Sequence, residues 1–536
     1  MTSKFSRRAA LRMLAASVAG AAVPMAFSGS AAAASTALKQ SIAMASARDR
    51  TLAQFYKARD YEPIFVGSSD RRRRTALIKA FAGAGDHGLP VDRYEEQELR
   101  DLFRSAKGAD ARGKAEIVAA QKFLAYADDI GSGILNPRRI DKGLVMKVAR
   151  YDQKSLLAGF AQSNPKAFLN ALPPQSRDYV RLQKEKLRLE KLLGKGGWGK
   201  KVAAKSLKPG AGGDPVVDLR NRLIRMGFMR KSSSKVYDAK LEGGVRNFQA
   251  AHGLAADGVA GAQTMAQVNK QVEDRLAQVI VALERRRWNN TELARNYVWV
   301  NIPDYHVDLY KGGKSVFRSR VVVGQNSKDR RTPEFSDTMR FMVVNPSWYV
   351  PRSIITKEYL PLLQEDPTAV SQLQLTDDAG RIVSRQAVDF TQYNEEDFPF
   401  SMKEPPNRGN ALGLVKFMFP NRHNIYLHDT PSKNLFSRQR RAFSHGCIRV
   451  HKPFDFAYAL LKSQVNDPKG YFQRALSTRK EAQIDLKEPL PVHLVYYTAW
   501  VDQKGAPQYR NDVYGRDKRI FGALAKAGVS LRAVRS

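Results

Sequence analysis

The spacing of apolar residues divides the chain into a helical first half and a strand-rich second half. Between residues 39 and 195, apolar side chains recur three or four positions apart, as Ile78, Phe81 and Ala82 do. This period places such side chains on one face of a helix. Clusters of glycine and proline, such as Gly83-Ala84-Gly85, separate the periodic segments. We therefore predict an all-α domain over residues 39–195.

A second, smaller helical unit follows. Residues 196–213 are rich in glycine and lysine, which is typical of a linker. Residues 214–270 then carry three successive apolar faces at helical spacing, and Gly227 ends the first of them. Gly253 and Gly258 suit tight turns between the later helices. We predict a three-helix domain over residues 214–270. A further helical face leads out of it and consists of Val272, Leu276, Val279 and Leu283.

From residue 297 onwards the period shortens to two. Residues 297–302 alternate as a half-buried strand does, and residues 306–310 and 316–323 flank a Lys-Gly-Gly-Lys turn as the arms of a hairpin. These patterns predict a β-rich domain over residues 295–475, which a C-terminal strand segment at residues 488–520 completes. Further strands are predicted at residues 339–344, 414–419, 425–427 and 491–501.

An insertion interrupts this run of strands. Residues 352–413 have mixed polar sequence and contain the pair Pro405-Pro406. Long insertions beside a functional site often act as lids. An inert surface excursion would have the same pattern, so both interpretations stay open at this point.

The charge balance is strongly basic. The 536 residues contain 89 lysines and arginines against 52 acidic residues, which gives a formal net charge of +37. Such an excess indicates a polyanionic partner, and nucleic acid is the first class to consider. The start of the chain argues against nucleic acid.

Residues 1–34 have the layout of a secretory signal peptide. A basic start precedes an apolar stretch over residues 9–27, and a run of alanines ends at Ala34, where we expect cleavage. The pair Arg7-Arg8 also resembles a twin-arginine signal, so either export route fits. An exported basic protein meets cell-wall polymers and lipid headgroups instead of DNA. We expect no membrane span in the mature chain, because no later run of about 18 apolar residues occurs.

The only cysteine in the chain is Cys447. A single thiol forms no internal disulfide, and in an exported protein a conspicuous sequence around it favours reactivity over a structural role. Ser444, His445 and Gly446 precede it. Upstream, a short alternating strand ends on His428, and 447 − 428 = 19 residues separate the two. A strand end and a following loop can bring these side chains together.

A hydrophobic strand ending in His428-Asp429-Thr430, followed by Ser-His-Gly-Cys-Ile-Arg-Val at residues 444–450, resembles the catalytic signature of the L,D-transpeptidases, which remodel bacterial peptidoglycan. Residues 248–259 are similar to the three-helix peptidoglycan-binding domain. The alternative interpretation of that unit is a helical spacer whose motif residues only stabilise its fold. The resemblance implies a periplasmic, wall-associated protein whose catalytic domain has a β-sandwich-like fold, with the cysteine in a cleft and a capping subdomain at residues 352–413.

Short motifs elsewhere are similar to the large Gram-negative members of that family. In the first domain, residues 86–89 read Asp-His-Gly-Leu and residues 131–137 read Gly-Ser-Gly-Ile-Leu-Asn-Pro. Near the C-terminus, residues 496–501 and 512–517 also match this subgroup. The resemblance therefore covers most of the mature chain. His87, in the first of these motifs, is interpreted as a structural residue of a turn.

Thiol chemistry assigns the central roles. A thiol attacks an amide carbonyl as thiolate, so Cys447 needs a proton acceptor within hydrogen-bond reach. We assign this role to His428, whose other ring nitrogen is oriented by the backbone carbonyl or the side chain of Asp429. The amides of Gly446 and Cys447 are expected to donate to the oxyanion, and His445 is expected to shape this loop.

Four further residues are expected to support the site. Arg449 either stabilises negative charge or ties down its strand, and Ser444 forms hydrogen bonds within the loop. By resemblance, Tyr426 and Trp348 line the substrate cleft, although an aromatic residue on a strand is more often part of the core.

A zinc site was weighed against this chemistry, because zinc binds histidine and thiolate ligands. The His-x-Cys spacing on a turning loop is a poor fit to the usual paired ligands, so we expect no metal and no other cofactor. The histidines and cysteine concerned are His423, His428, His445, Cys447 and His451.

The reaction implied by the resemblance is acyl transfer between peptidoglycan stem peptides. Cys447 attacks a stem tetrapeptide, releases D-alanine and passes the acyl group to a diaminopimelate amine, which makes a 3→3 cross-link. Water as acceptor would make the protein an L,D-carboxypeptidase, and a protein amine would make it an anchoring transferase. A non-catalytic wall-binding protein is the remaining alternative.

Overall fold

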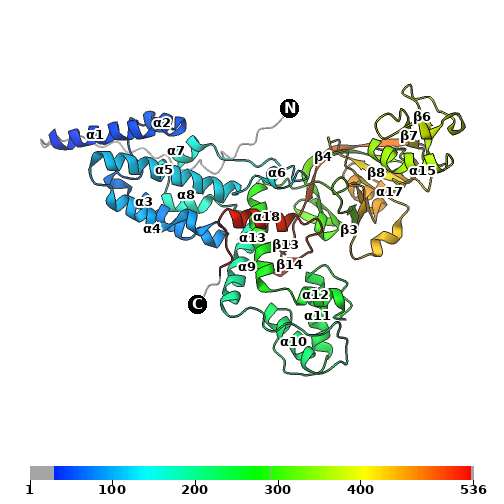
Figure 1. The fold of residues 1–536 in the computed structure, drawn as a ribbon, viewed down its shortest axis with the longest axis horizontal. Coiled ribbons are helices and arrows are strands. Elements are labelled where there is room, and N and C mark those ends of the chain that lie inside the picture. The colour runs from blue at the N-terminus through cyan, green and yellow to red at the C-terminus, as the bar shows by residue number, and fades with distance from the viewer. Residues whose placement is uncertain (1–28, 291, 533–536) are drawn as a thin grey trace.

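The computed structural model describes residues 29–290 and 292–532. Residues 1–28, which hold most of the expected signal peptide, lie outside the described residues, and helix α1 (Gly29–Ser46) runs through Ala34. The molecule is elongated, with a helical part at one end, a β-rich part at the other and a small helical unit beside the middle (Figure 1). Over the described ranges, no helix combines the length and apolar character needed to cross a bilayer.

The predicted all-α domain is confirmed. Its core surrounds the long helix α5, where the buried carboxylate of Glu116 accepts hydrogen bonds from the Tyr56 hydroxyl and from the backbone N–H groups of Ile64, Phe65 and Val66. This carboxylate fixes an irregular segment that has no ladder partners of its own. After α1, the helices are α2 (Arg50–Lys57), α3 (Arg71–Ala82), α4 (Glu96–Ser105), α5 (Gly108–Ser132), α6 (Pro137–Ile140), α7 (Gln153–Gln162), α8 (Pro165–Ala171) and α9 (Arg177–Gly194).

The three-helix unit and the helix after it are also confirmed. Gly227 adopts φ = 87° and ends the first helix in the left-handed conformation that favours glycine. The segment at 196–213 contains no helix or strand, but Trp198 and Val202 are buried, so it packs more firmly than a flexible linker. The helices are α10 (Asp214–Met226), α11 (Ala239–Ala251), α12 (Ala262–Val268) and α13 (Val272–Trp288).

A nine-stranded sheet forms the β-rich part, in the order β10-β3-β11-β9-β8-β4-β12-β1-β2. The long strand β3 also pairs with β2, so the sheet closes on itself around an apolar core. The strands are β1 (Tyr297–Asn301), β2 (His306–Lys311), β3 (Lys314–Gly324), β4 (Phe335–Val344), β8 (Val415–Met418), β9 (Leu427–His428), β10 (Ala442–Ser444), β11 (Ile448–Val450) and β12 (Ala482–Val495). Helices α16 (Pro453–Leu461) and α17 (Pro468–Ser477) follow β11.

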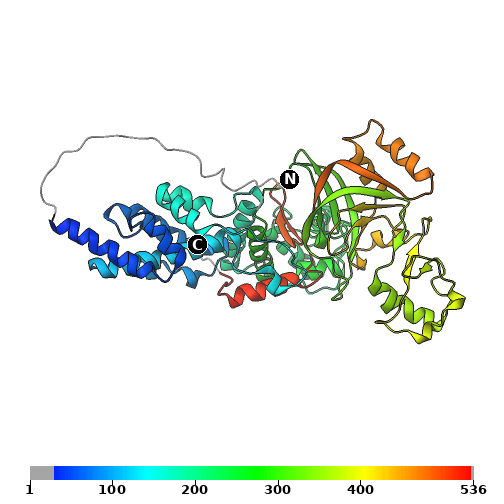
Figure 2. The same ribbon diagram turned by 90° about the horizontal axis from the view of Figure 1, so that it is seen from above.

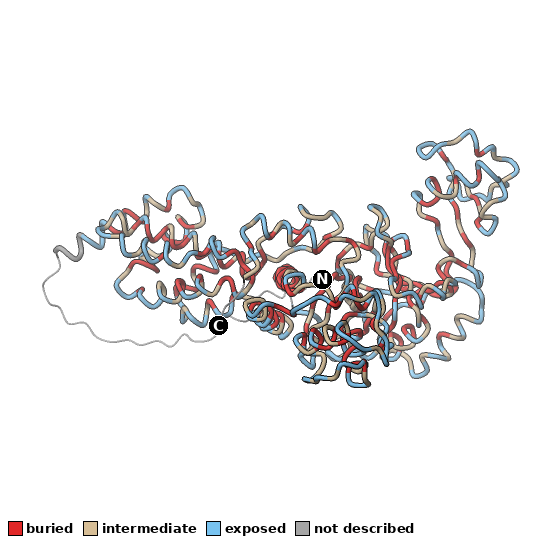
Figure 3. The backbone as a smooth tube through the Cα atoms, turned by 60° about the horizontal axis from the view of Figure 1, so that its bottom comes forward, coloured by how far each residue is buried: buried red, intermediate tan, exposed pale blue. Residues whose placement is uncertain are grey.

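The insertion at residues 352–413 folds as a separate unit, which we call the cap. It has its own apolar core and carries two strands, which β5 from the segment just before it completes to a three-stranded sheet in the order β5-β7-β6. Figure 2 shows the cap (yellow-green) standing away from the helical domain, and Figure 3 shows buried positions inside each part of the molecule. The strands of this sheet are β5 (Trp348–Tyr349), β6 (Gln374–Thr376) and β7 (Ser401–Glu404), and the longest helix of the cap is α15 (Leu360–Glu365).

The C-terminal segment divides between two parts of the molecule. Strand β12 joins the large sheet, but β13 (Ala499–Val501) and β14 (Pro507–Tyr509) pair only with each other among the described strands. Ala499, Tyr509 and helix α18 (Arg516–Lys526) pack with α9, α13 and the three-helix unit. Tyr496 and Tyr514, however, lie in the core of the large sheet, so residues 488–520 contribute both to the β-rich part and to the helical core beside α13.

A buried ion-pair network joins the helical and β-rich parts. Arg285 of α13 binds Glu334 at 2.7 Å and Asp517 at 2.8 Å, and Arg516 binds Glu334 at 3.1 Å. The backbone of Glu334 also bonds to residues of the helical domain, since its N–H donates to the Gly143 carbonyl at 2.7 Å. All four charged side chains are buried. Removing one charge would leave its partners desolvated and uncompensated.

Glu334→Gln is expected to lower the free energy of unfolding by about 3 kcal/mol. The substitution removes the negative charge that Arg285 and Arg516 share, and both arginines stay buried. Urea unfolding followed by circular dichroism measures this change. Glu488→Gln, on the exposed side of β12, is the matched control and should shift stability by less than about 0.5 kcal/mol. Equal stability of the two variants would contradict a coupling role for the network.

Candidate active site

Two short parallel strands bring the candidate nucleophile and base to one face of the large sheet. Strand β9 lies beside β11 with His428 opposite Arg449, and the Ile448 N–H donates to the Tyr426 carbonyl at 3.0 Å. Side chains alternate along a strand, so Tyr426, His428, Cys447 and Arg449 point to the same side. The rings of Tyr426 and His428 meet edge to face, with centroids 5.7 Å apart.

The loop before the nucleophile is held by two hydroxyl groups. Ser444 Oγ donates to the Cys447 carbonyl at 2.5 Å and accepts from the Gly446 N–H at 3.2 Å, while Thr332 Oγ1 donates to the Gly446 carbonyl at 2.7 Å. Gly446 has φ = 118°, a conformation that side chains disfavour, and a Cβ there would lie 3.2 Å from Ile425 Cδ1. The sharp turn therefore requires glycine.

These bonds separate the two amides expected to form an oxyanion hole. The Gly446 N–H is occupied by Ser444, whereas no hydrogen bond to the Cys447 N–H occurs among the described residues. The Cys447 amide is therefore the group that is free to donate to a developing negative charge.

Burial keeps both reactive groups neutral in the free protein. Cys447 Sγ is half-buried, 3.5 Å from the Asn424 carbonyl, and burial raises its pKa to about 11 against the opposing effects of Tyr426 and Arg449. His428 is only 4% exposed, and burial, followed by the charge of Arg449, lowers its pKa to about 3. The resting pair is therefore a thiol and an uncharged imidazole.

The carboxylate of Asp429 does not orient the imidazole. It accepts hydrogen bonds from the Leu414 N–H at 3.0 Å and the Thr430 N–H at 2.7 Å, and it forms an ion pair with Lys433. His428 Nδ1 is buried and makes no hydrogen bond of good geometry, while the backbone carbonyls of Asp429 and Leu412 lie close enough to oppose the fall in its pKa. Of the two alternatives for Asp429, its backbone carbonyl is the one compatible with this geometry.

Arg449 stands beside both reactive groups as an unpaired cation. Its Nε is buried without a partner, and no ion pair or hydrogen bond to its side chain is found within the described ranges. It lowers the pKa values of both Cys447 and His428. An unpaired charge that is partly buried costs free energy. Of the two roles weighed for Arg449, binding of negative charge agrees better with this environment than anchoring of the strand.

The cap contacts the cysteine loop directly. Glu358 of the cap accepts from His445 Nε2 at 2.8 Å and from Arg330 at 2.6 Å. Trp348 of β5 packs edge to face against Tyr359 of the cap, with centroids 6.5 Å apart, and lies near the Tyr426 hydroxyl. The two aromatic residues expected in the cleft therefore lie where the cap meets the sheet.

The histidines considered as zinc ligands lie in different environments. His423 packs against Phe335 with centroids 5.1 Å apart, and His451 packs against Phe436 at 4.9 Å. His445 is engaged by Glu358. Their closeness in sequence therefore does not produce one shared coordination centre.

Two residues that shape the site were not found from the sequence. Thr332 bonds to Gly446 from 114 positions away, and Glu358 bonds to His445 from 87 positions away. Neither residue lies in a recognisable motif. Their roles depend on tertiary packing, so the only signal available was the position of Glu358 inside the long insertion.

Comparison with known proteins identifies the parts of the chain. Residues 295–476 match the family described as L,D-transpeptidase catalytic domain, residues 50–185 match the Scaffold domain, and residues 212–268 match the "Putative peptidoglycan binding domain". These matches confirm the resemblance found from the sequence. The match to an L,D-transpeptidase catalytic domain thus lies in the β-rich part of the chain, and the other two matches lie in the helical parts that precede it.

Related proteins agree with this assignment. A curated protein of Haemophilus influenzae named "Putative L,D-transpeptidase" is 35% identical over 227 residues, which are 42% of this chain and 45% of the relative. This chain thus spans slightly less than half of the relative's length. Crystal structures of L,D-transpeptidases from Xylanimonas cellulosilytica and Stackebrandtia nassauensis are 15% and 12% identical, with TM-scores of 0.17 and 0.22. The matches cover 55% and 54% of this chain, and 100% and 95% of those two chains. With TM-scores this low, the two structures add no support to the assignment.

Iodoacetamide is expected to alkylate Cys447 slowly at neutral pH, because a pKa of about 11 leaves about one thiol in 10⁴ ionised at pH 7. The rate constant should rise about tenfold for each pH unit between about pH 7 and 10, as the thiolate fraction does. Intact-protein mass spectrometry measures the adduct, and Cys447→Ala gives the background because it removes the only thiol. A plateau below about pH 8 would indicate a preformed thiolate–imidazolium pair and contradict the neutral resting state.

Proposed function

We propose that this chain, which matches an L,D-transpeptidase catalytic domain over residues 295–476, is a peptidoglycan L,D-transpeptidase that makes 3→3 cross-links. The observation that carries the proposal is the shared face of β9 and β11, where His428, Cys447 and Arg449 point to one side of the sheet and Arg449 lies near both reactive groups. The peptidoglycan-binding domain supports the same polymer as substrate. A cysteine acyltransferase mechanism follows from these residues.

In the first half-reaction, Cys447 attacks the amide carbonyl between the third residue of the donor stem and its terminal D-alanine. His428 accepts the thiol proton as the C–S bond forms, and the Cys447 N–H donates a hydrogen bond to the oxyanion. The C–N bond then breaks, and the imidazolium returns the proton to the departing amine. The products are free D-alanine and a thioester on Cys447.

In the second half-reaction, a diaminopimelate amine attacks the thioester. His428 accepts a proton from this amine and returns it to the departing sulfur, so a new amide and a free thiol result. Amide exchange through a thioester needs no nucleotide. The D-alanine amide is broken and the amide between the stems is formed, so the number of amide bonds is unchanged.

The neutral resting pair determines how this chemistry begins. With a thiol pKa of about 11 and an imidazole pKa of about 3, an ion pair does not form in the free protein. The thiol points to the Asn424 carbonyl, and hydrogen bonds between catalytic groups often tighten only when substrate binds. We therefore place the proton transfer within the attack on the donor, where the negative oxyanion offsets the positive charge that develops on His428, and Arg449 stabilises the oxyanion.

We assign the cap to closure over the donor. Its Glu358 binds the cysteine loop through His445, and Trp348 and Tyr426 lie where it meets the sheet. Closure would exclude water from the thioester and favour an amine acceptor over hydrolysis. We further propose that the protein is exported and acts at the wall in the periplasm, where the peptidoglycan-binding domain keeps it on its substrate.

Incubation of the purified protein with disaccharide tetrapeptide is expected to give a cross-linked dimer. Its mass should equal that of two monomers less one D-alanine molecule. Cys447→Ala should give none, and His428→Ala should reduce the rate by at least about 100-fold, because it removes the proton acceptor. Mass spectrometry distinguishes the alternatives. Tripeptide alone would identify an L,D-carboxypeptidase, transfer only to a protein amine would identify an anchoring transferase, and no product would leave a wall-binding protein.

Glu358→Ala is expected to loosen the cap, because it removes the bonds to His445 and Arg330. Hydrogen exchange across residues 352–413 should become faster, and the fraction of donor that is hydrolysed instead of transferred should rise several-fold. Glu395→Ala, at an exposed position of the cap, is the control and should change neither quantity. An unchanged partition between hydrolysis and transfer in Glu358→Ala would refute the assignment of the cap as a water-excluding lid.

A further inference from the structure

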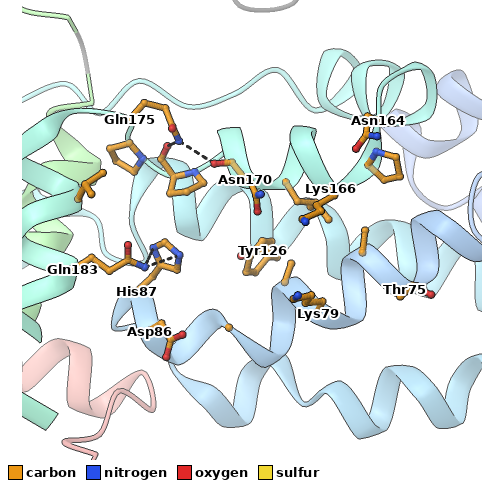
Figure 4. Close-up of a pocket in the computed structure, with 18 of the residues that line it drawn as sticks. Thr75, Lys79, Asp86, His87, Tyr126, Asn164, Lys166, Asn170, Gln175 and Gln183 are labelled. Atoms are coloured by element: carbon orange, nitrogen blue, oxygen red, sulfur yellow. Dashed lines mark hydrogen bonds between the residues drawn. The ribbon is translucent and has the colours of Figure 1, made fainter. Parts of the chain in front are cut away.

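A large cleft lies in the scaffold domain, outside the β-rich part that carries Cys447. It has a volume of about 820 Å³ and lies between helices α3, α8 and α9, with Tyr126 of α5 at its base (Figure 4). Ligand sites commonly measure about 300–1,000 Å³. None of the catalytic residues contributes to this cleft, and the reaction proposed above makes no use of it.

The walls of the cleft carry a strong excess of positive charge. Arg71, Arg72, Lys79 and Lys166 line it, while Asp86 is the only acidic residue in its lining. All four side chains are exposed, and no ion pair with a carboxylate is found for any of them among residues 29–290 and 292–532. Lys79 of α3 and Lys166 of α8 stand on opposite walls (Figure 4). Cations that face one another without an acid between them attract an anionic ligand.

The floor of the cleft is uncharged and aromatic. His87 Nδ1 lies 3.1 Å from the Tyr179 hydroxyl, and the Gln183 amide lies 3.1 Å from His87 Nε2. Burial, together with Arg287 and Lys186, lowers the pKa of His87 to about 3, so the ring adds no charge at neutral pH. A neutral floor of rings with polar edges suits a ligand that has hydroxyl and amide groups as well as anions.

Side-chain amides on the rim add hydrogen-bonding capacity. Asn164, Asn170 and Gln175 line the cleft. The Gln175 amide donates to the carbonyls of Asn170 and Pro173, whereas no bond to the Asn170 side chain is found within the described parts of the chain. An amide offers both donors and acceptors to a peptide or a sugar. Simple phosphate would leave these groups unused.

We propose that this cleft is a second substrate-binding site, which takes a carboxylate-bearing glycopeptide of peptidoglycan through Lys79 and Lys166. The identity of the polymer rests on the proposed function, since the other two domains of the chain match a peptidoglycan-binding and an L,D-transpeptidase domain. Stem peptides supply the carboxylates and amides, and the glycan supplies hydroxyls. A site in the scaffold domain, apart from the catalytic one, would engage the same strand at a second point and raise the local concentration of donor stems.

The test uses the full chain with Cys447→Ala, so that ligand binds without turnover. Disaccharide tetrapeptide is expected to slow hydrogen exchange at residues 71–87 and 164–183 by at least about fivefold. Chitotetraose, which has the sugar hydroxyls without carboxylates, should not. Lys79→Glu/Lys166→Glu should abolish the protection. Lys57→Glu/Lys107→Glu changes the same net charge at exposed positions of the same domain and should keep it.

The proposal is overturned if the parent shows no protection in the cleft, if chitotetraose protects it equally, or if the charge-reversed cleft retains protection. Lys79→Ala/Lys166→Ala provides a milder variant that should weaken binding at least about tenfold while the far-ultraviolet circular dichroism stays native. Protection at residues 424–450 and the product assay report on the catalytic site separately. Failure of the cleft proposal is therefore distinguishable from failure of the proposed transpeptidase reaction.

Discussion

The pairing of β9 with β11 is the constraint on which the candidate site depends. Strand β9 has two residues and is held between β8 and β11, so its register is set by neighbours on both sides. Because side chains alternate along a strand, a slip of one residue would turn His428 to the opposite face from Cys447. The closed sheet provides the rigidity that so short a strand lacks, and Thr332 and Ser444 extend that control to the nucleophile's loop.

Desolvation, more than ionic pairing, sets the electrostatics of this face. Burial disfavours the thiolate and the imidazolium alike, and Arg449 opposes it at Cys447 while adding to it at His428. Arg449 therefore suits the binding of a negative charge that forms during the reaction. It does not produce a stable thiolate in the free protein. Arg449 and the Cys447 N–H would stabilise the oxyanion once the donor is bound, and exclusion of water by the cap would strengthen both interactions.

Local patterns in the sequence were sufficient for much of the fold. Helical periodicity identified the scaffold, the three-helix unit and α13, and alternation identified most strands of the large sheet. The motif around Cys447 and the spacing to His428 indicated the reactive pair. In each case the information lies within a few turns or strands of chain, where period and turn residues determine the structure.

The remaining features depend on contacts between distant segments. The Asp429 carboxylate is taken by Lys433 and two backbone amides, and Trp198 is buried within a segment whose composition is that of a linker. The C-terminal strands leave the large sheet because Tyr509 packs beside α9 and α13, where its hydroxyl donates to buried Glu185 at 2.8 Å. Tertiary packing determines these features, so the local pattern of apolar residues does not predict them.

The most direct test of the account is the mass of the protein after brief mixing with disaccharide tetrapeptide whose diaminopimelate amine has been acetylated, so that no acceptor amine is present. The account predicts a covalent adduct equal to the donor less D-alanine, located on Cys447 by peptide mapping and released by hydroxylamine as a thioester is. An adduct on any other residue would contradict it, and so would a protein that stays unmodified here yet cross-links the tetrapeptide with a free amine.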